Sequence, residues 1–126
     1  MSRRALPLIA LLGLGLRIYP WLQANAFRGV LEYDDGVYYG VAVLLLHGEL
    51  PYRDYTIVHP PGAGLLLLPA AAVGELLTDS WGMAAARILI VAVALLNTYL
   101  VHRLAARWSP TAGLVAAAAY AVIHGA

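Results

Sequence analysis

The sequence predicts an all-α membrane protein. We expect about three transmembrane helices, with two membrane-parallel helices in a large first extracytoplasmic loop. Composition is the first observation: 62% of the 126 residues are hydrophobic and 12% are charged, whereas a soluble domain carries about 25% charged residues. The second observation is the presence of three apolar segments, at 5–22, 83–104 and 109–126. Each is about as long as the roughly 20 apolar residues that a helix needs to cross a bilayer.

Composition also limits the chemistry. The chain contains no cysteine, so neither a disulfide framework nor a thiolate metal site can form. Its formal net charge is only +1, which excludes the strongly basic footprint of a nucleic-acid-binding protein. The expected partner is therefore the lipid bilayer and not a nucleic acid.

The first apolar segment, 5–22, is expected to be a span. Arg3 and Arg4 precede it, and Arg17 and Trp21 lie near its far end, where side chains of this type anchor a helix at the membrane interface.

A cleaved signal peptide is the alternative for this segment. Ser2-Arg3-Arg4 resembles a twin-arginine start, and Ala24-Asn25-Ala26 resembles a cleavage site. Arg17 and Trp21 separate the apolar run from that site, so we favour the span.

The loop at 23–82 is predicted to hold helices at 35–47 and 61–77. Asp34 or Asp35 is the expected N-cap of the first, and Gly48 its stop. At about 12 residues this helix is too short to cross a bilayer, so we expect it to lie along the membrane surface.

The distribution of arginines predicts the topology. Arg3 and Arg4 place the N-terminus in the cytoplasm, and Arg103 and Arg107 form the other short basic region. An even number of crossings must separate two cytoplasmic regions, so 61–77 is expected not to cross. Alternatively, 61–77 spans, as its hydropathy alone indicates, and Arg103 and Arg107 then lie outside.

The last apolar segment, 109–126, is expected to be the third span, with Ser109 as its N-cap and Pro110 at its first helical position. The chain reaches Ala126 within a hydrophobic run. We therefore expect it to be the N-terminal piece of a longer protein.

Most of the polar chemistry falls in the loop at 23–82, which contains all seven acidic residues. A membrane protein that concentrates ionisable groups beside the bilayer generally uses them. Asp34 and Asp35 are the candidate catalytic residues, because a carboxylate at a helix N-terminus stays ionised and can act as a base or a metal ligand. No cofactor is certain from the sequence, although a divalent metal is one option. The alternative role for this pair is a plain helix cap.

Two arginines are candidate phosphate ligands. Arg53 could bind a phosphate or simply pair with its neighbour Asp54. Arg87 lies within an apolar span, where an unpaired arginine costs several kcal/mol. It must therefore pair, reach the surface or bind an anion.

Aromatic residues and one histidine complete the candidate site. Tyr38 and Tyr52 lie beside the carboxylates, where tyrosines either hold a sugar or anchor the loop at the interface. His59 precedes Pro60-Pro61, which keeps it extended. We include these three side chains as candidate substrate-binding residues.

The order of these motifs resembles the N-terminal part of the GT-C superfamily of membrane glycosyltransferases. The resembling enzymes use polyprenyl-phosphate sugars and include protein O-mannosyltransferases and the lipid A aminoarabinose transferase. The motifs are a first span, Tyr33-Asp34-Asp35-Gly36-Val37-Tyr38-Tyr39, Gly48-Glu49-Leu50-Pro51-Tyr52-Arg53-Asp54-Tyr55, His59-Pro60-Pro61-Gly62 and Ala86-Arg87.

The resemblance implies roles for particular residues. Asp34 would be the catalytic base or, as in the oligosaccharyltransferase branch, a metal ligand, and Asp35 would accompany it. Arg87 would contact the phosphate of the lipid-linked donor. The family commonly has Asp-Glu where this chain has Asp34-Asp35, and a basic residue where it has His59. These enzymes have roughly ten spans, so we expect this chain to be inactive alone.

The expected function is thus transfer of a sugar from a polyprenyl-phosphate donor to an extracytoplasmic acceptor, in a bilayer of the bacterial plasma-membrane type. Two alternatives remain: a non-catalytic polytopic protein, such as a transporter fragment or assembly subunit, and a small structural membrane protein. A transporter places ionisable groups inside its spans, whereas here they lie in the loop.

Overall fold

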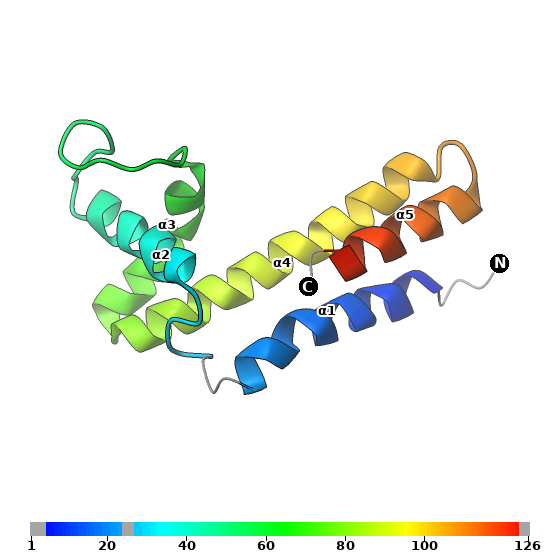
Figure 1. Cartoon of the computed structure of the whole chain (residues 1–126), viewed down its shortest axis with the longest axis horizontal. Coiled ribbons are helices and arrows are strands. Elements are labelled where there is room, and N and C mark those ends of the chain that lie inside the picture. Colours follow the sequence, from blue (N-terminus) through cyan, green and yellow to red (C-terminus); the bar gives the residue numbers. More distant parts are fainter. Residues whose placement is uncertain (1–4, 24–26, 124–126) are drawn as a thin grey trace. The chain divides into compact units, whose positions relative to one another are not determined.

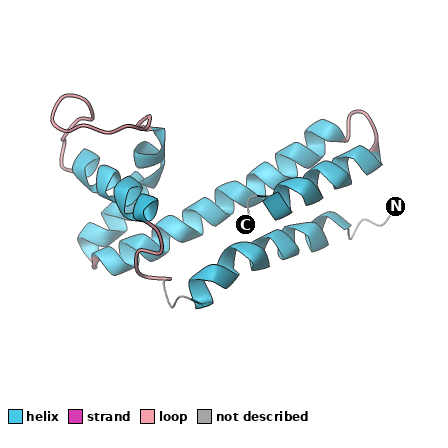
Figure 2. Cartoon of the chain, viewed as in Figure 1, coloured by secondary structure: helices cyan, strands magenta, loops and turns pink. Residues whose placement is uncertain are grey.

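The computed structural model describes residues 5–23 and 27–123, and in these ranges it consists of helices joined by loops, with no strand (Figures 1 and 2). The all-α prediction is therefore confirmed for the described residues. The five helices are α1 (Ala5–Gln23), α2 (Tyr33–Leu46), α3 (Gly62–Leu76), α4 (Asp79–Ala105) and α5 (Pro110–Ile123).

The helices belong to two compact units. Residues 24–89 form one, the acidic unit, which contains α2, α3 and the first part of α4. Residues 1–23 and 90–126 form the other, the basic unit, which contains α1, α5 and the rest of α4.

The core of the acidic unit is formed by α2, α3 and the start of α4. Small side chains make much of it, so the helices can approach closely. The buried residues are Tyr39, Ala42, Leu67, Ala70, Ala71, Met83 and Ala86.

One aromatic side chain fits between two glycines in this core. The hydroxyl of Tyr39 lies where a Cβ atom would be on Gly74 of α3 or on Gly82 of α4. It donates a hydrogen bond to the Asp79 carboxylate at 3.3 Å. Both glycines are therefore required by the close approach of the Tyr39 ring.

The end of α2 agrees with the sequence. The helix ends at Leu46, and Gly48 follows with a φ of 83°, a conformation that glycine adopts without strain. His47, the C-cap residue, lies 3.5 Å from the Glu75 carboxylate on α3. A hydrogen bond to the Val43 carbonyl and the charge of Glu75 raise the pKa of His47.

The start of α2 differs from the prediction. The helix begins at Tyr33 and its N-cap is Glu32, so Asp34 and Asp35 lie in the first turn and neither is the N-cap. The backbone of Leu31 donates to the Asp35 carboxylate at 3.2 Å. Asp35 is the third residue of the helix, and a side chain at this position that bonds to the backbone before the helix stabilises the helix start. The helix can therefore begin before its acidic pair.

In the basic unit α1 packs against α5. Gly13 of α1 lies against Ala121 of α5. Arg17 crosses the same contact, because its guanidinium donates to the Gly13 carbonyl at 2.9 Å and to the Ala121 carbonyl at 3.3 Å. One nitrogen of an arginine in an apolar helix thus bonds to backbone oxygens of both helices.

The start of α5 is as predicted. The Ser109 hydroxyl accepts a hydrogen bond from the Ala112 backbone at 3.0 Å, and Pro110 is the first helical residue. Gly113 lies against His102 of α4 and against Ala106, which follows α4, and its missing side chain allows this close approach.

Among the described residues, two helices are long and apolar enough to cross a membrane: α1, with 19 residues, and α4, with 27. The predicted third span has a described helix of only 14 residues, or about 21 Å at 1.5 Å per residue. The hydrocarbon core is about 30 Å thick. By length, the described chain therefore has two candidate spans instead of about three. Residues 124–126 lie outside the described residues.

The helix at 61–77 is observed as α3, with 15 residues. It is also shorter than a bilayer is thick, which is compatible with a segment that does not cross. Its orientation to the membrane stays a prediction.

We predict that Gly82→Ala destabilises the protein by about 1–3 kcal/mol, because the added methyl overpacks the contact with Tyr39. Gly40→Ala is the matched control in α2, since nothing lies within 4 Å of a Cβ at that position. There alanine should be neutral or stabilising by up to about 1 kcal/mol. Thermal unfolding in detergent measures both, and equal midpoints for the two variants would contradict the packing.

Candidate functional site

The first feature of the candidate site is an ion pair between α4 and α2. Nη2 of Arg87 lies 2.9 Å from Oδ2 of Asp35. Arg87 is buried, with 5% of its surface exposed, whereas the Asp35 side chain is 40% exposed. The requirement that an arginine in an apolar helix must pair is therefore met inside the acidic unit.

Arg87 holds a second segment as well. Its Nη1 donates to the Phe27 carbonyl at 3.1 Å. Because Asp35 also accepts the Leu31 backbone N–H, one guanidinium and one carboxylate fix the chain that leads into α2. Arg87 thus pairs with protein atoms, and its contact with a donor phosphate stays a prediction.

Asp34 differs from its neighbour. Its side chain is exposed, and among the described residues it has no hydrogen-bond or ion-pair partner. It lies in the first turn of α2. The two adjacent aspartates therefore differ in availability: Asp35 is held by Arg87, and Asp34 faces solvent.

Two candidate residues of the loop between α2 and α3, Tyr52 and His59, contact each other, and His59 also contacts Tyr38 of α2. The rings of Tyr38 and His59 are 5.5 Å apart, centre to centre. The Tyr52 hydroxyl donates to the His59 carbonyl at 2.9 Å. Tyr52 has a φ of 67°, which is uncommon for a residue other than glycine. The local fold thus gathers the predicted Tyr38, Tyr52 and His59.

The fourth loop candidate, Arg53, pairs with its neighbour. Its guanidinium donates two hydrogen bonds to Oδ2 of Asp54, at 2.7 and 3.1 Å, and one to Oδ1 at 2.9 Å. The Leu50 backbone N–H also donates to Asp54. These contacts lower the pKa of Asp54. The structure thus shows the pairing with Asp54, and a phosphate-binding role for Arg53 stays a prediction.

The sequence reasoning missed Tyr39 and Asp79. They line an open apolar pocket of about 530 Å³ beside the start of α2. Burial and the nearby Asp79 raise the pKa of Tyr39 to about 12, so its hydroxyl stays protonated and donates. The pocket is lined by Val30, Gly36, Tyr39, Gly40, Val43, Leu44, Asp79 and Met83.

A cation also covers the first turn of α4. The Arg28 guanidinium lies 3.8 Å from the ring centre of Trp81, a cation–π geometry.

The position of Tyr39 had one signal in the sequence. Two glycines 8 positions apart, Gly74 and Gly82, indicate that a bulky side chain fits between α3 and α4. The signal did not say which one.

A metal site is not formed by the described residues. Within 5–23 and 27–123, three His, Asp or Glu side chains do not gather at metal-binding distance. Asp34 and Asp35 supply two neighbouring carboxyl groups, one of them engaged by Arg87.

Comparison of the chain with protein-family models, with curated proteins and with solved structures gave no match. The functional interpretation therefore rests on the geometry of the acidic unit.

Proposed function

We propose that this chain is the N-terminal part of a GT-C-like membrane glycosyltransferase, which transfers a sugar from a polyprenyl-phosphate donor to an extracytoplasmic acceptor. The observation that supports this most is that the two adjacent aspartates have different surroundings. Arg87 holds Asp35, while Asp34 stays exposed in the first turn of α2. A positioned and ionised carboxylate beside the membrane is what an acceptor hydroxyl needs as a base.

In the proposed reaction Asp34 accepts the proton of the acceptor hydroxyl. The hydroxyl oxygen attacks the anomeric carbon of the donor sugar, and the bond from that carbon to the phosphate oxygen breaks. The phosphate leaves with the bonding electrons. Attack on the face opposite the leaving group inverts the anomeric configuration.

Arg87 has a positioning role in this proposal. It fixes Asp35 and the chain before α2, and so fixes the turn that carries Asp34. A donor phosphate that reached Arg87 would compete with Asp35 for the guanidinium. The phosphate contact implied by the family resemblance is thus proposed as a second role.

The loop aromatics are proposed to bind the sugar. The Tyr38 and His59 rings form a tilted pair, and Tyr52 ties its own loop to His59. Aromatic faces next to carboxylates suit a sugar ring, which presents both apolar and hydroxyl surfaces. Arg53, which is paired with Asp54, could reach a phosphate only if that pair opened.

The proposal includes a topology: a cytoplasmic N-terminus, and the region 23–82 outside a bacterial-type plasma membrane. We predict that cysteines at Thr56 and Thr78, both exposed, react with an impermeant thiol reagent applied to intact cells. The chain has no cysteine of its own, so each label is unambiguous. Labelling at Thr56 alone would mean that α3 crosses the membrane.

We predict that Asp34→Asn lowers turnover of the complete protein by roughly 10²–10⁴-fold, the usual contribution of a general base. The amide keeps the shape of the side chain and removes its basicity. Glu32→Gln is the matched control, because it neutralises an exposed carboxylate two residues away. The assay is sugar transfer from a polyprenyl-phosphate donor at matched expression. Near-normal turnover of Asp34→Asn would exclude the assigned base.

A further inference from the structure

The charges of the chain are segregated between its two units. All seven acidic residues lie between Glu32 and Asp79, in the acidic unit. The basic unit contains five arginines and neither aspartate nor glutamate. Its arginine side chains therefore have no carboxylate side chain of their own unit to pair with.

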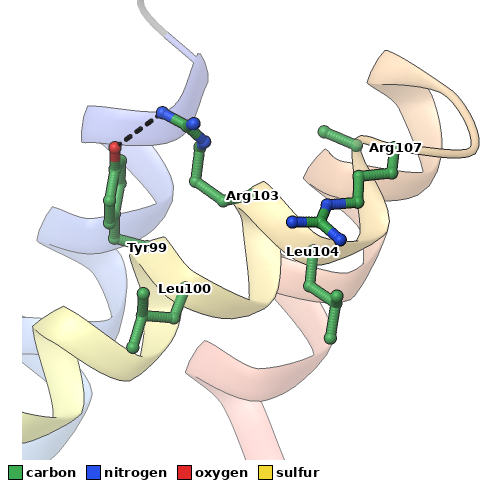
Figure 3. Close-up of a pocket in the computed structure, with 6 residues that line it drawn as sticks. Tyr99, Leu100, Arg103, Leu104 and Arg107 are labelled. Atoms are coloured by element: carbon green, nitrogen blue, oxygen red, sulfur yellow. Dashed lines mark hydrogen bonds between the residues drawn. The ribbon is translucent and has the colours of Figure 1, made fainter.

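Two of these arginines line a groove at the C-terminal end of α4 (Figure 3). The groove has a volume of about 670 Å³ and is open to solvent on one side. It is formed within the basic unit by one helix end and the turn that follows. The lining residues are Tyr99, Leu100, Arg103, Leu104, Ala106 and Arg107.

Both cations line this groove. Arg103 donates to the Tyr99 hydroxyl at 3.0 Å, and its guanidinium lies 5.8 Å from the centre of the Tyr99 ring. Arg107 lies just beyond the end of α4, in the turn that follows Ala105. Among the described residues the Arg107 guanidinium has no recorded hydrogen bond or ion pair. Arg103 is thus positioned by Tyr99, and Arg107 is available to bind an anion.

The rest of the groove is apolar and exposed. Leu100 is 50% exposed and Leu104 is 56% exposed. Trp108, at 79% exposure, follows the groove in the chain. Aromatic side chains of this kind lie at membrane–water interfaces, and α4 is long and apolar enough to span a bilayer. An occupant should therefore combine an anionic group with an apolar chain.

We propose that this groove binds an anionic phospholipid, with Arg103 and Arg107 on the headgroup phosphate and Leu100 and Leu104 against the first part of an acyl chain. Guanidinium groups match the geometry of phosphate oxygens. A soluble phosphate would satisfy the arginines and leave the leucines exposed, so the lipid is the better match. The site is separate from Asp34 and does not depend on the proposed glycosyltransferase activity.

The test is a binding titration of the purified chain in neutral detergent with fluorescent phosphatidylglycerol, and with fluorescent phosphatidylcholine for comparison. We expect saturable binding of phosphatidylglycerol, at least about tenfold tighter than phosphatidylcholine. Arg103→Gln and Arg107→Gln should each weaken it about tenfold, the effect of one charged hydrogen bond of about 1.4 kcal/mol. Tyr99→Phe should weaken it less, because it only frees Arg103.

Arg28→Gln is the charge-matched control. It removes one positive charge from the acidic unit and should leave the affinity for phosphatidylglycerol unchanged. An equal loss of affinity in this variant would show that the binding depends on net charge alone and would overturn the proposed site. Helical circular dichroism checks that each variant is folded, and Arg103→Lys should recover part of the affinity.

A competition arm separates the two sources of phosphate. Inorganic phosphate at millimolar concentration should not displace the lipid, because it lacks the apolar part. Displacement by inorganic phosphate, or equal affinity for phosphatidylcholine, would overturn the lipid assignment. Loss of sugar transfer with intact lipid binding would bear on the proposed function alone.

Discussion

The arrangement of the acidic unit depends on a buried arginine that has to be neutralised. Arg87 is almost completely out of contact with water, and an isolated charge in such surroundings costs several kcal/mol. Asp35 and the Phe27 carbonyl together meet this requirement. Three stretches of chain are tied by one side chain: the segment before α2, the start of α2 and the first half of α4. The price of burying the charge is thus offset by contacts that also fix where α2 begins.

This ion pair makes two neighbouring carboxylates chemically unequal. Adjacent residues on a helix point in different directions, so a partner that holds Asp35 cannot also hold Asp34. Asp34 is left exposed in the same first turn. A site that needs one carboxylate for positioning and another as a free base can be built in this way from two consecutive aspartates. The carboxylate side chains are also unevenly distributed along the chain. All of them lie in the acidic unit, whereas the arginines of the basic unit have no carboxylate side chain in their own unit.

Local chemistry made several elements predictable. Gly48 ends α2, and Ser109 with Pro110 begins α5, because these residues act on the backbone directly around them. The need for a partner at Arg87 was also predictable, since it follows from burial of a charge. Its identity was not, because Asp35 is 52 residues away and only the fold brings the two side chains together.

Other features depended on packing between helices. The N-cap of α2 was misplaced, because Asp35 stabilises the helix start from its first turn and not from the cap. Tyr39 was missed as a partner of Asp79 because only the fold brings it between Gly74 and Gly82. The sequence did place Tyr38, Tyr52 and His59 in the region 23–82, whereas their contacts with one another are brought about by the fold.

The most direct test of the central claim, that Arg87 and Asp35 stabilise the acidic unit through each other, is a double-mutant cycle. The free energy of unfolding in detergent is measured for the wild type, Arg87→Gln, Asp35→Asn and the double variant. Contacting residues of this kind show coupling of about 0.5–3 kcal/mol, and we expect a value in the upper half of that range because Arg87 is buried. Additive effects, with coupling below about 0.5 kcal/mol, would contradict the account.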